Sequence, residues 1–298
     1  MRIGERFNRM LFNLTVRGIE TTPVIRRGDL PLIALSMVQK RDVHAYLLAL
    51  KSFCRHVSAS RIVVVADPTL DKQCREILRR QVPHIEFRDA REFQHPSIPK
   101  GGCWERLAAI SQYVSEAYVI QLDADTVTVG PLDDVTTAVR DQVAFTLGTE
   151  DDQSIVTCKE ISAWARARLA PDSHIQVVAE ANLADVEGAE DLRYIRGCAG
   201  FAGYPRGSFD TARLHSLSER MRRLMPDKWD LWGTEQFTSN VLVASMPGAR
   251  VLPHPTYCAP HRRRADSVFL HFIGYVRYST MLYASLARRV TRELRAPS

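Results

Sequence analysis

Apolar residues in the first half of the chain form short runs rich in Val, Ile and Leu, which alternate with segments where they recur at helical spacing. The short runs predict strands and the spaced segments predict helices. In order, the expected elements are strand 30–38, helix 43–57, strand 61–66, helix 70–80, strand 84–87, helix 104–114 and strand 117–122. Strands that alternate with helices predict right-handed crossovers, so the expected fold class is α/β, with a mostly parallel central sheet and helices on both faces.

The second half of the chain has a weaker pattern. A charged segment, 149–191, contains two faint helical stretches and is expected to be a surface insertion. The other expected elements are strand 142–147, strand or turn 197–205, helix 232–244, strand 251–255, strand 268–273 and a basic amphipathic helix over 275–295. We therefore divide the chain into a basic N-terminal arm (1–28), one α/β domain (29–274) and a basic amphipathic C-terminal helix (275–298).

Composition narrows the class of protein only slightly. The 298 residues are 45% hydrophobic, which is enough for a sizeable core, and the net charge of +6 is too small to indicate nucleic-acid binding. The sequence has neither a signal-peptide pattern nor an apolar run long enough to span a bilayer, so we expect a cytoplasmic protein. The cysteines include no Cys-x-x-Cys pair and are expected to be reduced thiols: Cys54, Cys74, Cys103, Cys158, Cys198 and Cys258.

Two aspartates one residue apart follow the most apolar predicted strand. Asp123 and Asp125 come directly after Leu122, in the sequence Leu-Asp-Ala-Asp-Thr. In parallel sheets, ligands bind beyond the carboxyl ends of the strands, which is where this pair falls. Carboxylate oxygens are the ligands that Mg²⁺ and Mn²⁺ prefer, and these ions also bind phosphate oxygens. Aspartate pairs are also common in turns, so the pair alone leaves a metal site and a structural turn as alternatives.

Two further residues could complete a site with this pair. His271 lies in an apolar run that ends at Gly274, and Arg106 lies on the predicted helix that leads into the strand of Asp123. A lone histidine in an apolar run is more often a core residue, and a lone arginine on a helix is more often a solvated charge. Taken by itself, each of these two residues could therefore be either structural or functional.

Taken together and in order, the motifs of the chain resemble glycosyltransferase family 8, the glycogenin and lipopolysaccharide-galactosyltransferase group. That family has an Arg-Leu before the metal strand, a Leu-Asp-Ala-Asp-Thr type of motif, a small-residue turn with Asn, an Asp-Gln pair followed by Asn, and a His-Phe-x-Gly-x-x-Lys motif. The corresponding segments here are 106–107, 122–126, 198–200, 235–240 and 271–277. The chain has Cys198 where the family has Asn, Glu235 where it has Asp, and Arg277 where it has Lys.

The resemblance implies the GT-A fold, which is a Rossmann-like α/β fold, and an enzyme of the hexosyltransferase type. It implies that Asp123, Asp125 and His271 together bind one Mn²⁺ or Mg²⁺ that bridges the two phosphates of the donor. The residues implied for donor binding are Arg106, Asp123, Ala124, Gly274 and Arg277. The residues implied for catalysis are Gln236, which would face the reacting anomeric carbon, Glu235 beside it, and Arg106.

The same resemblance implies the partners of the chain. The expected donor is a nucleotide-diphosphate sugar, in particular a UDP-sugar, and the sugar is expected to be transferred with retention to a glycan, a lipid or another hydroxyl acceptor. Among the aromatic residues, Trp232 is the best candidate to stack on the acceptor because it directly precedes the Gly-Thr-Glu-Gln segment. The basic C-terminal helix suggests a peripheral contact with an anionic membrane, and the alternative is that its apolar side packs on the sheet.

Two other functions stay open at this stage. The segment around Asp123 also resembles the first motif of haloacid-dehalogenase phosphatases, in which the first aspartate is the nucleophile. Against this, the phosphatase motif belongs on the first strand of its fold, whereas several strand and helix units precede Asp123 here. The other alternative is a catalytically inactive protein that binds a nucleotide sugar.

Overall fold

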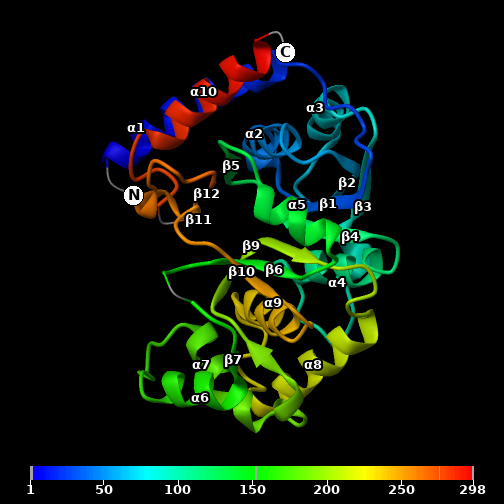
Figure 1. Ribbon diagram of the computed structural model, residues 1–298, viewed down its shortest axis with the longest axis vertical. Coiled ribbons are helices and arrows are strands. Elements are labelled where there is room, and N and C mark those ends of the chain that lie inside the picture. Colours follow the sequence, from blue (N-terminus) through cyan, green and yellow to red (C-terminus); the bar gives the residue numbers. More distant parts are fainter. Residues whose placement is uncertain (1–2, 152, 275, 297–298) are drawn as a thin grey trace.

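A mixed sheet of seven strands forms the centre of the protein (Figure 1). The computed structural model describes residues 3–151, 153–274 and 276–296, so the outermost residues of the predicted arm and tail, and Tyr275 of the predicted site motif, lie outside the described part. Across the sheet the strands are β10 (Arg250–Leu252), β6 (Phe145–Gly148), β9 (Gly197–Tyr204), β4 (Tyr118–Leu122), β1 (Leu30–Val38), β2 (Ala59–Ala66) and β3 (Ile85–Asp89).

Most neighbouring strands of this sheet are parallel, as the sequence predicts. Strand β1 pairs in parallel with β2 and β4, and β2 pairs in parallel with β3. Only β9 runs antiparallel to its neighbours, β4 and β6. Two small sheets accompany the large one: β11 (Tyr257–Cys258), β12 (Phe269–His271) and β5 (Thr126–Thr128) form one, and β7 (Val156–Thr157) and β8 (Arg193–Tyr194) form the other.

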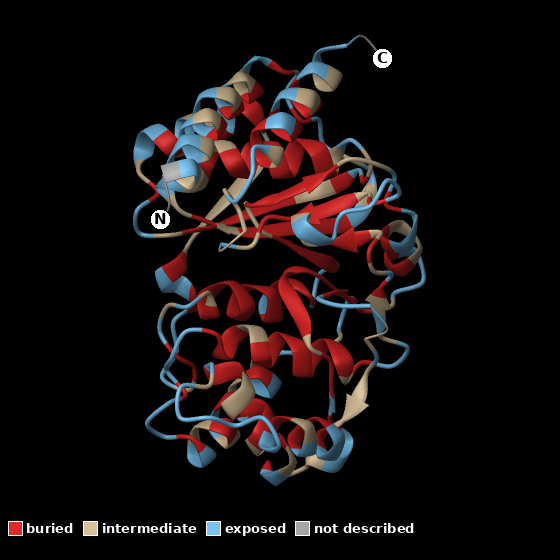
Figure 2. Cartoon of the chain, turned by 90° about the vertical axis from the view of Figure 1, so that its left-hand side faces the viewer, coloured by how far each residue is buried: buried red, intermediate tan, exposed pale blue. Residues whose placement is uncertain are grey.

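Helices cover both faces of the central sheet, and Figure 2 shows the buried strands between them. The helices are α1 (Ile3–Val16), α2 (Val43–Cys54), α3 (Lys72–Gln81), α4 (Trp104–Tyr113), α5 (Asp133–Arg140), α6 (Cys158–Arg166), α7 (Ile175–Asn182), α8 (Thr211–Leu224), α9 (Thr234–Ala244) and α10 (Leu282–Arg295). Short 3₁₀ helices connect them: η1 (Arg17–Thr21), η2 (Lys40–Asp42), η3 (Ala90–Phe93), η4 (Leu183–Asp185), η5 (Ala189–Asp191) and η6 (Pro260–Arg262).

The two faces of the sheet carry separate hydrophobic cores because side chains alternate between the faces along a strand. On β1, Leu32 and Ala34 belong to the core under α1, α2, α3, α5 and α10. Ile33 and Leu35 belong to the core under α4 and α6 to α9. Strand β1 is therefore buried on both sides, which explains its almost unbroken apolar sequence.

The segment predicted as a basic arm contains helix α1. This helix packs beside α10, and the Phe12 ring stacks on Tyr283 with 3.8 Å between ring centroids. Phe12 and Val16 recur at helical spacing and are buried. The sequence alone did not indicate the helix, because its partner lies at the other end of the chain.

The prediction that residues 149–191 form a surface insertion is wrong. The two faint helical stretches are helices α6 and α7, but Ile161, Ile175 and Ala179 belong to the same core as α9. Strand β5 and helices α5 and α8 were also not predicted, although α8 has a clear signal. In α8, Asp210 accepts a hydrogen bond from Arg213 N at 2.8 Å, as an N-terminal capping residue does.

The apolar side of α10 is buried, so it is not available to contact a membrane. Tyr283, Leu286 and Val290 pack into the core with α1 and α2. The alternative left open for the basic tail was that this side packs on the sheet, and in the structure it is instead buried against other helices. Within the described ranges, none of the helices is both long and apolar enough to cross a bilayer.

Candidate functional site

The turn after β4 is held in place from three sides. Ser36 Oγ on β1 donates to the carbonyl of Leu122 at 2.6 Å, at the end of β4. The amide of Asp123 donates to the carbonyl of Gly200 on β9 at 2.9 Å. The carbonyl of Asp125 accepts from the amide of Phe272 at 2.8 Å, directly after β12. The backbone of both aspartates is therefore fixed at the rim of the sheet, where parallel strands end.

The pairing between β5 and β12 brings His271 to this turn. Strand β5 begins one residue after Asp125, and its first residue, Thr126, is the register partner of His271. The imidazole Nε2 of His271 lies 3.2 Å from Asp125 Oδ1 and 3.8 Å from Asp123 Oδ2. One potential ligand atom from each of Asp123, Asp125 and His271 lies within 4.8 Å of the others. Two carboxylates and an imidazole are a donor set that suits a divalent cation such as Mn²⁺.

Cationic groups surround Asp125. Its carboxylate accepts hydrogen bonds from His271 and from the guanidinium of Arg277. Arg277 also donates to Asp42 Oδ1 at 3.0 Å, so its guanidinium lies between two carboxylates. Burial raises the pKa of Asp125, but His271 and Arg277 outweigh burial and hold that pKa well below its ordinary value. Asp125 is therefore ionised and able to act as a metal ligand at neutral pH.

The imidazole of His271 is confined on its other side by β9. Its Nδ1 lies 3.2 Å from the Sγ of Cys198. A Cβ atom on Gly200 would lie 2.1 Å from Cε1 of the ring, so only glycine leaves room for the imidazole there. Burial lowers the pKa of His271, but Cys198 and Asp125 outweigh the effect of burial and hold that pKa well above its ordinary value. Both neighbours therefore fix the position of the ring.

Arg106 connects the metal-site aspartates to helix α9. Its guanidinium is buried and donates to Asp123 and, at 3.1 Å, to Glu235 Oε1. Burial raises the pKa of Glu235 to about 7, although Arg106 opposes this shift.

The sequence left open that Arg106 is a solvated charge on a helix, and the structure excludes that alternative because Arg106 is buried. Two carboxylates share one guanidinium, which fixes the side chain of Asp123 from behind.

The amide of Gln236 takes part in a second polar network, which the sequence did not predict. Gln236 Nε2 donates to Gln176 Oε1 at 2.9 Å. Gln176 Nε2 in turn donates to Glu180 Oε1 at 3.1 Å, and the hydroxyl of Tyr194 donates to the same oxygen at 2.8 Å. Glu180 is completely buried. The network therefore begins at a buried carboxylate and ends at a side chain that lines the cavity.

The metal-site residues, Arg106 and Gln236 line one cavity of about 330 Å³. All residues that the sequence indicated for metal binding, donor binding or catalysis border it: Arg106, Asp123, Ala124, Asp125, Glu235, Gln236, His271, Gly274 and Arg277. The roles implied for these residues stay predictions. Trp232 also lines the cavity and is 73% exposed, with its ring 5.9 Å from that of His174.

Several residues of this cavity lie outside the sequence motifs. Asp42, Cys103 and His174 line it but belong to none of the motifs. The glycine pair before Cys103 is a signal that could have indicated Cys103. Gly101, Gly102 and Cys103 all have positive φ angles and form a tight turn into α4. The sequence offered no comparable signal for Asp42 or His174.

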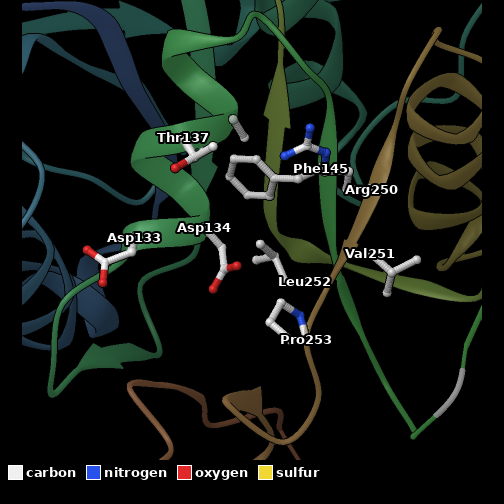
Figure 3. A pocket seen from close by; sticks show the side chains of 9 residues that line it. Asp133, Asp134, Thr137, Phe145, Arg250, Val251, Leu252 and Pro253 are labelled. Carbon is white, nitrogen blue, oxygen red and sulfur yellow. The ribbon is translucent and has the colours of Figure 1, made fainter.

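A second cavity, of about 170 Å³, lies between α5, strand β6 and the edge strand β10. Figure 3 shows Phe145, Leu252 and Pro253 along its wall, with Asp134 nearby and Asp133 turned away. The two carboxylates do not converge on a common point. The cavity at the rim of the sheet, where Asp123, Asp125 and His271 converge, is therefore the candidate functional site.

The comparison with solved structures agrees with this fold. No family model matches the sequence, and no curated protein matches it either. The solved structure of the galactosyltransferase LgtC in complex with donor and acceptor sugar analogues matches over 89% of this chain and 97% of its own length, with a TM-score of 0.53 and 11% sequence identity. Because the identity is so low, this likeness shows the fold alone. The predicted fold class is confirmed as an α/β fold of the GT-A type.

Two further solved structures are more distant. Mouse xyloside xylosyltransferase 1 in its apo form matches over 82% of this chain and 98% of its own, with 12% identity and a TM-score of 0.44. Core-mannan synthase A from Aspergillus fumigatus in its Mn/GDP form matches over 76% of this chain and 73% of its own, with 9% identity and a TM-score of 0.43.

Proposed function

We propose that this chain is a metal-dependent glycosyltransferase that takes a sugar from a nucleotide-diphosphate donor, with a UDP-sugar as the first candidate. The observation that carries the proposal is the convergence of Asp123, Asp125 and His271 from two distant parts of the chain to within 4.8 Å. A core histidine would not need two carboxylates beside it. The GT-A fold supports the same function, since LgtC was solved with donor and acceptor sugar analogues on this fold.

Asp123, Asp125 and His271 would hold Mn²⁺ or Mg²⁺, which would stabilise the negative charge that develops on the leaving diphosphate. The guanidinium of Arg277, which lies beside Asp125, is suited to bind the diphosphate because it can donate two parallel hydrogen bonds to phosphate oxygens. Gly274 lines the same side of the cavity and has no side chain to obstruct a phosphate. Ala124, between the two aspartates, would contact the donor through its backbone.

Arg106, Glu235 and Gln236 would act at the donor sugar. Glu235 and Asp123 hold the guanidinium of Arg106, so that it can orient Asp123 and donate to sugar hydroxyls. Gln236 uses its NH₂ group on Gln176, which leaves its carbonyl oxygen for the sugar. A neutral amide does not form a stable ester with the sugar, so this arrangement favours attack of the acceptor from the leaving-group side, with retention. Trp232 at the rim would stack on the acceptor.

Hydrolysis of the donor tests the proposal. UDP-, GDP- and CDP-sugars are each incubated with the protein and Mn²⁺, and release of the nucleoside diphosphate is measured with and without EDTA. We expect release from at least one of these donors and loss of that release with EDTA. If release continued after exhaustive chelation, the metal-dependent reaction would be refuted.

A phosphatase with Asp123 as nucleophile has less support. The carboxylate of Asp123 is engaged by Arg106. Its strand, β4, follows β1, β2 and β3 along the chain, whereas the phosphatase motif belongs on the first strand. The observation that favours it would be burst release of the alcohol from a phosphomonoester, with the phosphoryl group left on Asp123 until water releases it as phosphate. A binding protein without catalytic activity would bind the nucleotide sugar and release no product in the same assay.

A further inference from the structure

The outer face of α1 carries a stripe of exposed apolar side chains. Phe7, Met10 and Leu14 are 53%, 54% and 65% exposed, whereas Phe12 and Val16 on the other side of the helix are buried. Residues three, four and seven positions apart lie on the same side of an α-helix, so the three exposed side chains are neighbours. A helix that packs along one side usually presents polar residues on the other. Packing within this chain therefore does not explain the stripe.

Arginines accompany this apolar stripe. Arg6, Arg9 and Arg17 are exposed on α1 and on the first residue of η1. Together with Met10, Asn13 and Leu14, they line a groove of about 320 Å³ along the helix. The neighbouring helix adds a further positive charge, since Arg288 and Arg292 of α10 are also exposed. Figure 1 shows α1 and α10 side by side along one edge of the molecule, at the end opposite to α6 and α7.

Apolar residues flanked by arginines match the chemistry of an anionic lipid surface. Such a surface offers acyl chains for the apolar side chains and phosphates for the guanidinium groups. A second copy of this chain is a poorer partner, because a symmetric contact through α1 would bring the same arginines against each other.

We propose that the outer face of α1 docks on an anionic lipid surface. Phe7, Met10 and Leu14 enter the interface between headgroups and acyl chains, and the arginines of α1 and η1 bind the lipid phosphates. Helix α10 does not insert, because its apolar side is buried against α1. Its role is to support α1 from behind and to add positive charge.

This docking face is connected to the candidate active site through a short segment. Asn8 Nδ2 on α1 donates to the carbonyl of Tyr278 at 3.0 Å, and the preceding residue, Arg277, pairs with Asp125. A protein docked through α1 would therefore hold this side of its cavity near the lipid. In combination with the proposed function, this favours a lipid-linked acceptor. That consequence rests on the proposed function, whereas the docking itself does not.

Co-sedimentation with vesicles tests the docking and needs no enzymatic activity. The full chain is mixed with vesicles of phosphatidylcholine alone or with phosphatidylglycerol added. We expect binding only to the vesicles that contain phosphatidylglycerol, and weaker binding at high salt because salt screens the attraction. The double variant Phe7→Ser with Leu14→Ser should bind these vesicles at least about tenfold more weakly. The matched control is Leu169→Ser with Leu224→Ser, two exposed leucines far from α1, and it should bind like the wild type.

A charge variant completes the test. Arg6→Gln with Arg17→Gln should lose about tenfold in affinity for the anionic vesicles, whereas Arg262→Gln with Arg263→Gln, in another exposed basic segment, should lose none. The proposal is overturned if the wild type does not bind anionic vesicles, or if the two α1 variants bind as well as the wild type. It is also overturned if the wild type forms a dimer in solution that the Phe7→Ser, Leu14→Ser variant loses, while neither protein binds vesicles. Failure of donor hydrolysis would leave all these binding results unchanged.

Discussion

At the scale of single residues, the orientation of Gln236 depends on a carboxylate that does not touch the cavity. Glu180 accepts from Gln176 Nε2, so Gln176 must present its oxygen to Gln236. Gln236 must then present its NH₂ group to Gln176, and its own oxygen is left for a ligand. The sequence could not indicate this, because Gln176 and Glu180 lie in the segment that was expected to be a surface insertion. Their spacing of four residues along a helix is the only hint, and it is common.

We expect Gln176→Met to slow the reaction without weakening donor binding. Methionine has a similar length but offers no acceptor comparable to the amide oxygen, so Gln236 loses the hydrogen bond that orients it. The loss of one such bond corresponds to a decrease in kcat of about tenfold, with KM little changed. Steady-state kinetics with the donor found in the hydrolysis assay measure both constants. Gln112→Met, on the exposed side of α4, is the control. An unchanged kcat would show that Gln176 does not position Gln236.

Glu235 should make the stability of the protein depend on pH. Its pKa is raised from 4.5 to about 7 by burial, so the folded state binds the proton more tightly than the unfolded state. The free energy of unfolding should therefore fall as the pH rises from about 4.5 to about 7, by on the order of 3 kcal/mol from this group. Above about pH 7 the contribution of Glu235 to the free energy of unfolding no longer changes with pH. In Glu235→Gln this pH dependence should be absent.

Urea unfolding of the wild type and of Glu235→Gln at several pH values checks this prediction. The difference between the two proteins isolates Glu235, because they share all other titratable groups. Asp125 has a lowered pKa, so its own effect on the free energy of unfolding falls at lower pH. The same slope in both proteins between pH 4.5 and 7 would mean that folding does not raise the pKa of Glu235.

At the scale of elements, the site depends on a pair of three-residue strands. β5 and β12 pair so that Thr126 and His271 are partners, and β9 passes behind the imidazole at Gly200. The sequence predicted the strand around His271 from its apolar run, and it predicted the end of β4. It did not predict β5, because three residues are too few to show a period. The closeness of His271 and Asp125 could be predicted only from the resemblance of the motifs.

We expect Gly200→Ala to displace His271 and to weaken metal binding. The new Cβ would lie 2.1 Å from the imidazole, which is buried and cannot move aside freely. Mn²⁺ affinity should fall by at least about tenfold, by analogy with the loss of groups that orient metal ligands. Gly18→Ala is the matched control, because its Cβ would meet only ordinary contacts, the nearest at 3.5 Å. If Gly200→Ala folded and bound Mn²⁺ as tightly as the wild type, His271 would not be a ligand.

At the scale of the whole molecule, the two ends of the chain form one layer. Helices α1 and α10 pack side by side over the core that also contains α2 (Figure 1). The alternating strand and helix pattern was enough to predict the α/β fold class and the mostly parallel sheet. It was not enough to predict the antiparallel position of β9 or the pairing of α1 with α10. Both depend on contacts between residues far apart in the sequence, which a local pattern does not contain.

We expect Phe12→Ala to lower the free energy of unfolding by about 3 kcal/mol, because it removes a buried ring. The ring of Phe12 stacks on Tyr283 and is 2% exposed. Phe7→Ala, on the exposed side of the same helix, should change the stability by less than about 0.5 kcal/mol. Chemical unfolding of the two variants and the wild type provides the comparison. Equal effects would mean that α1 does not pack on α10 as described.

Mn²⁺ binding, followed by electron paramagnetic resonance in the presence of UDP, is the most direct test of the metal site. The wild type should bind one Mn²⁺ per chain. Asp125→Asn removes a ligand charge but keeps the shape of the side chain, and it should weaken binding by at least about tenfold. His271→Ala should do the same, whereas Asp133→Asn, at the start of α5 and away from the site, should bind like the wild type. Equal Mn²⁺ affinity in all four proteins would contradict a metal site formed by Asp123, Asp125 and His271.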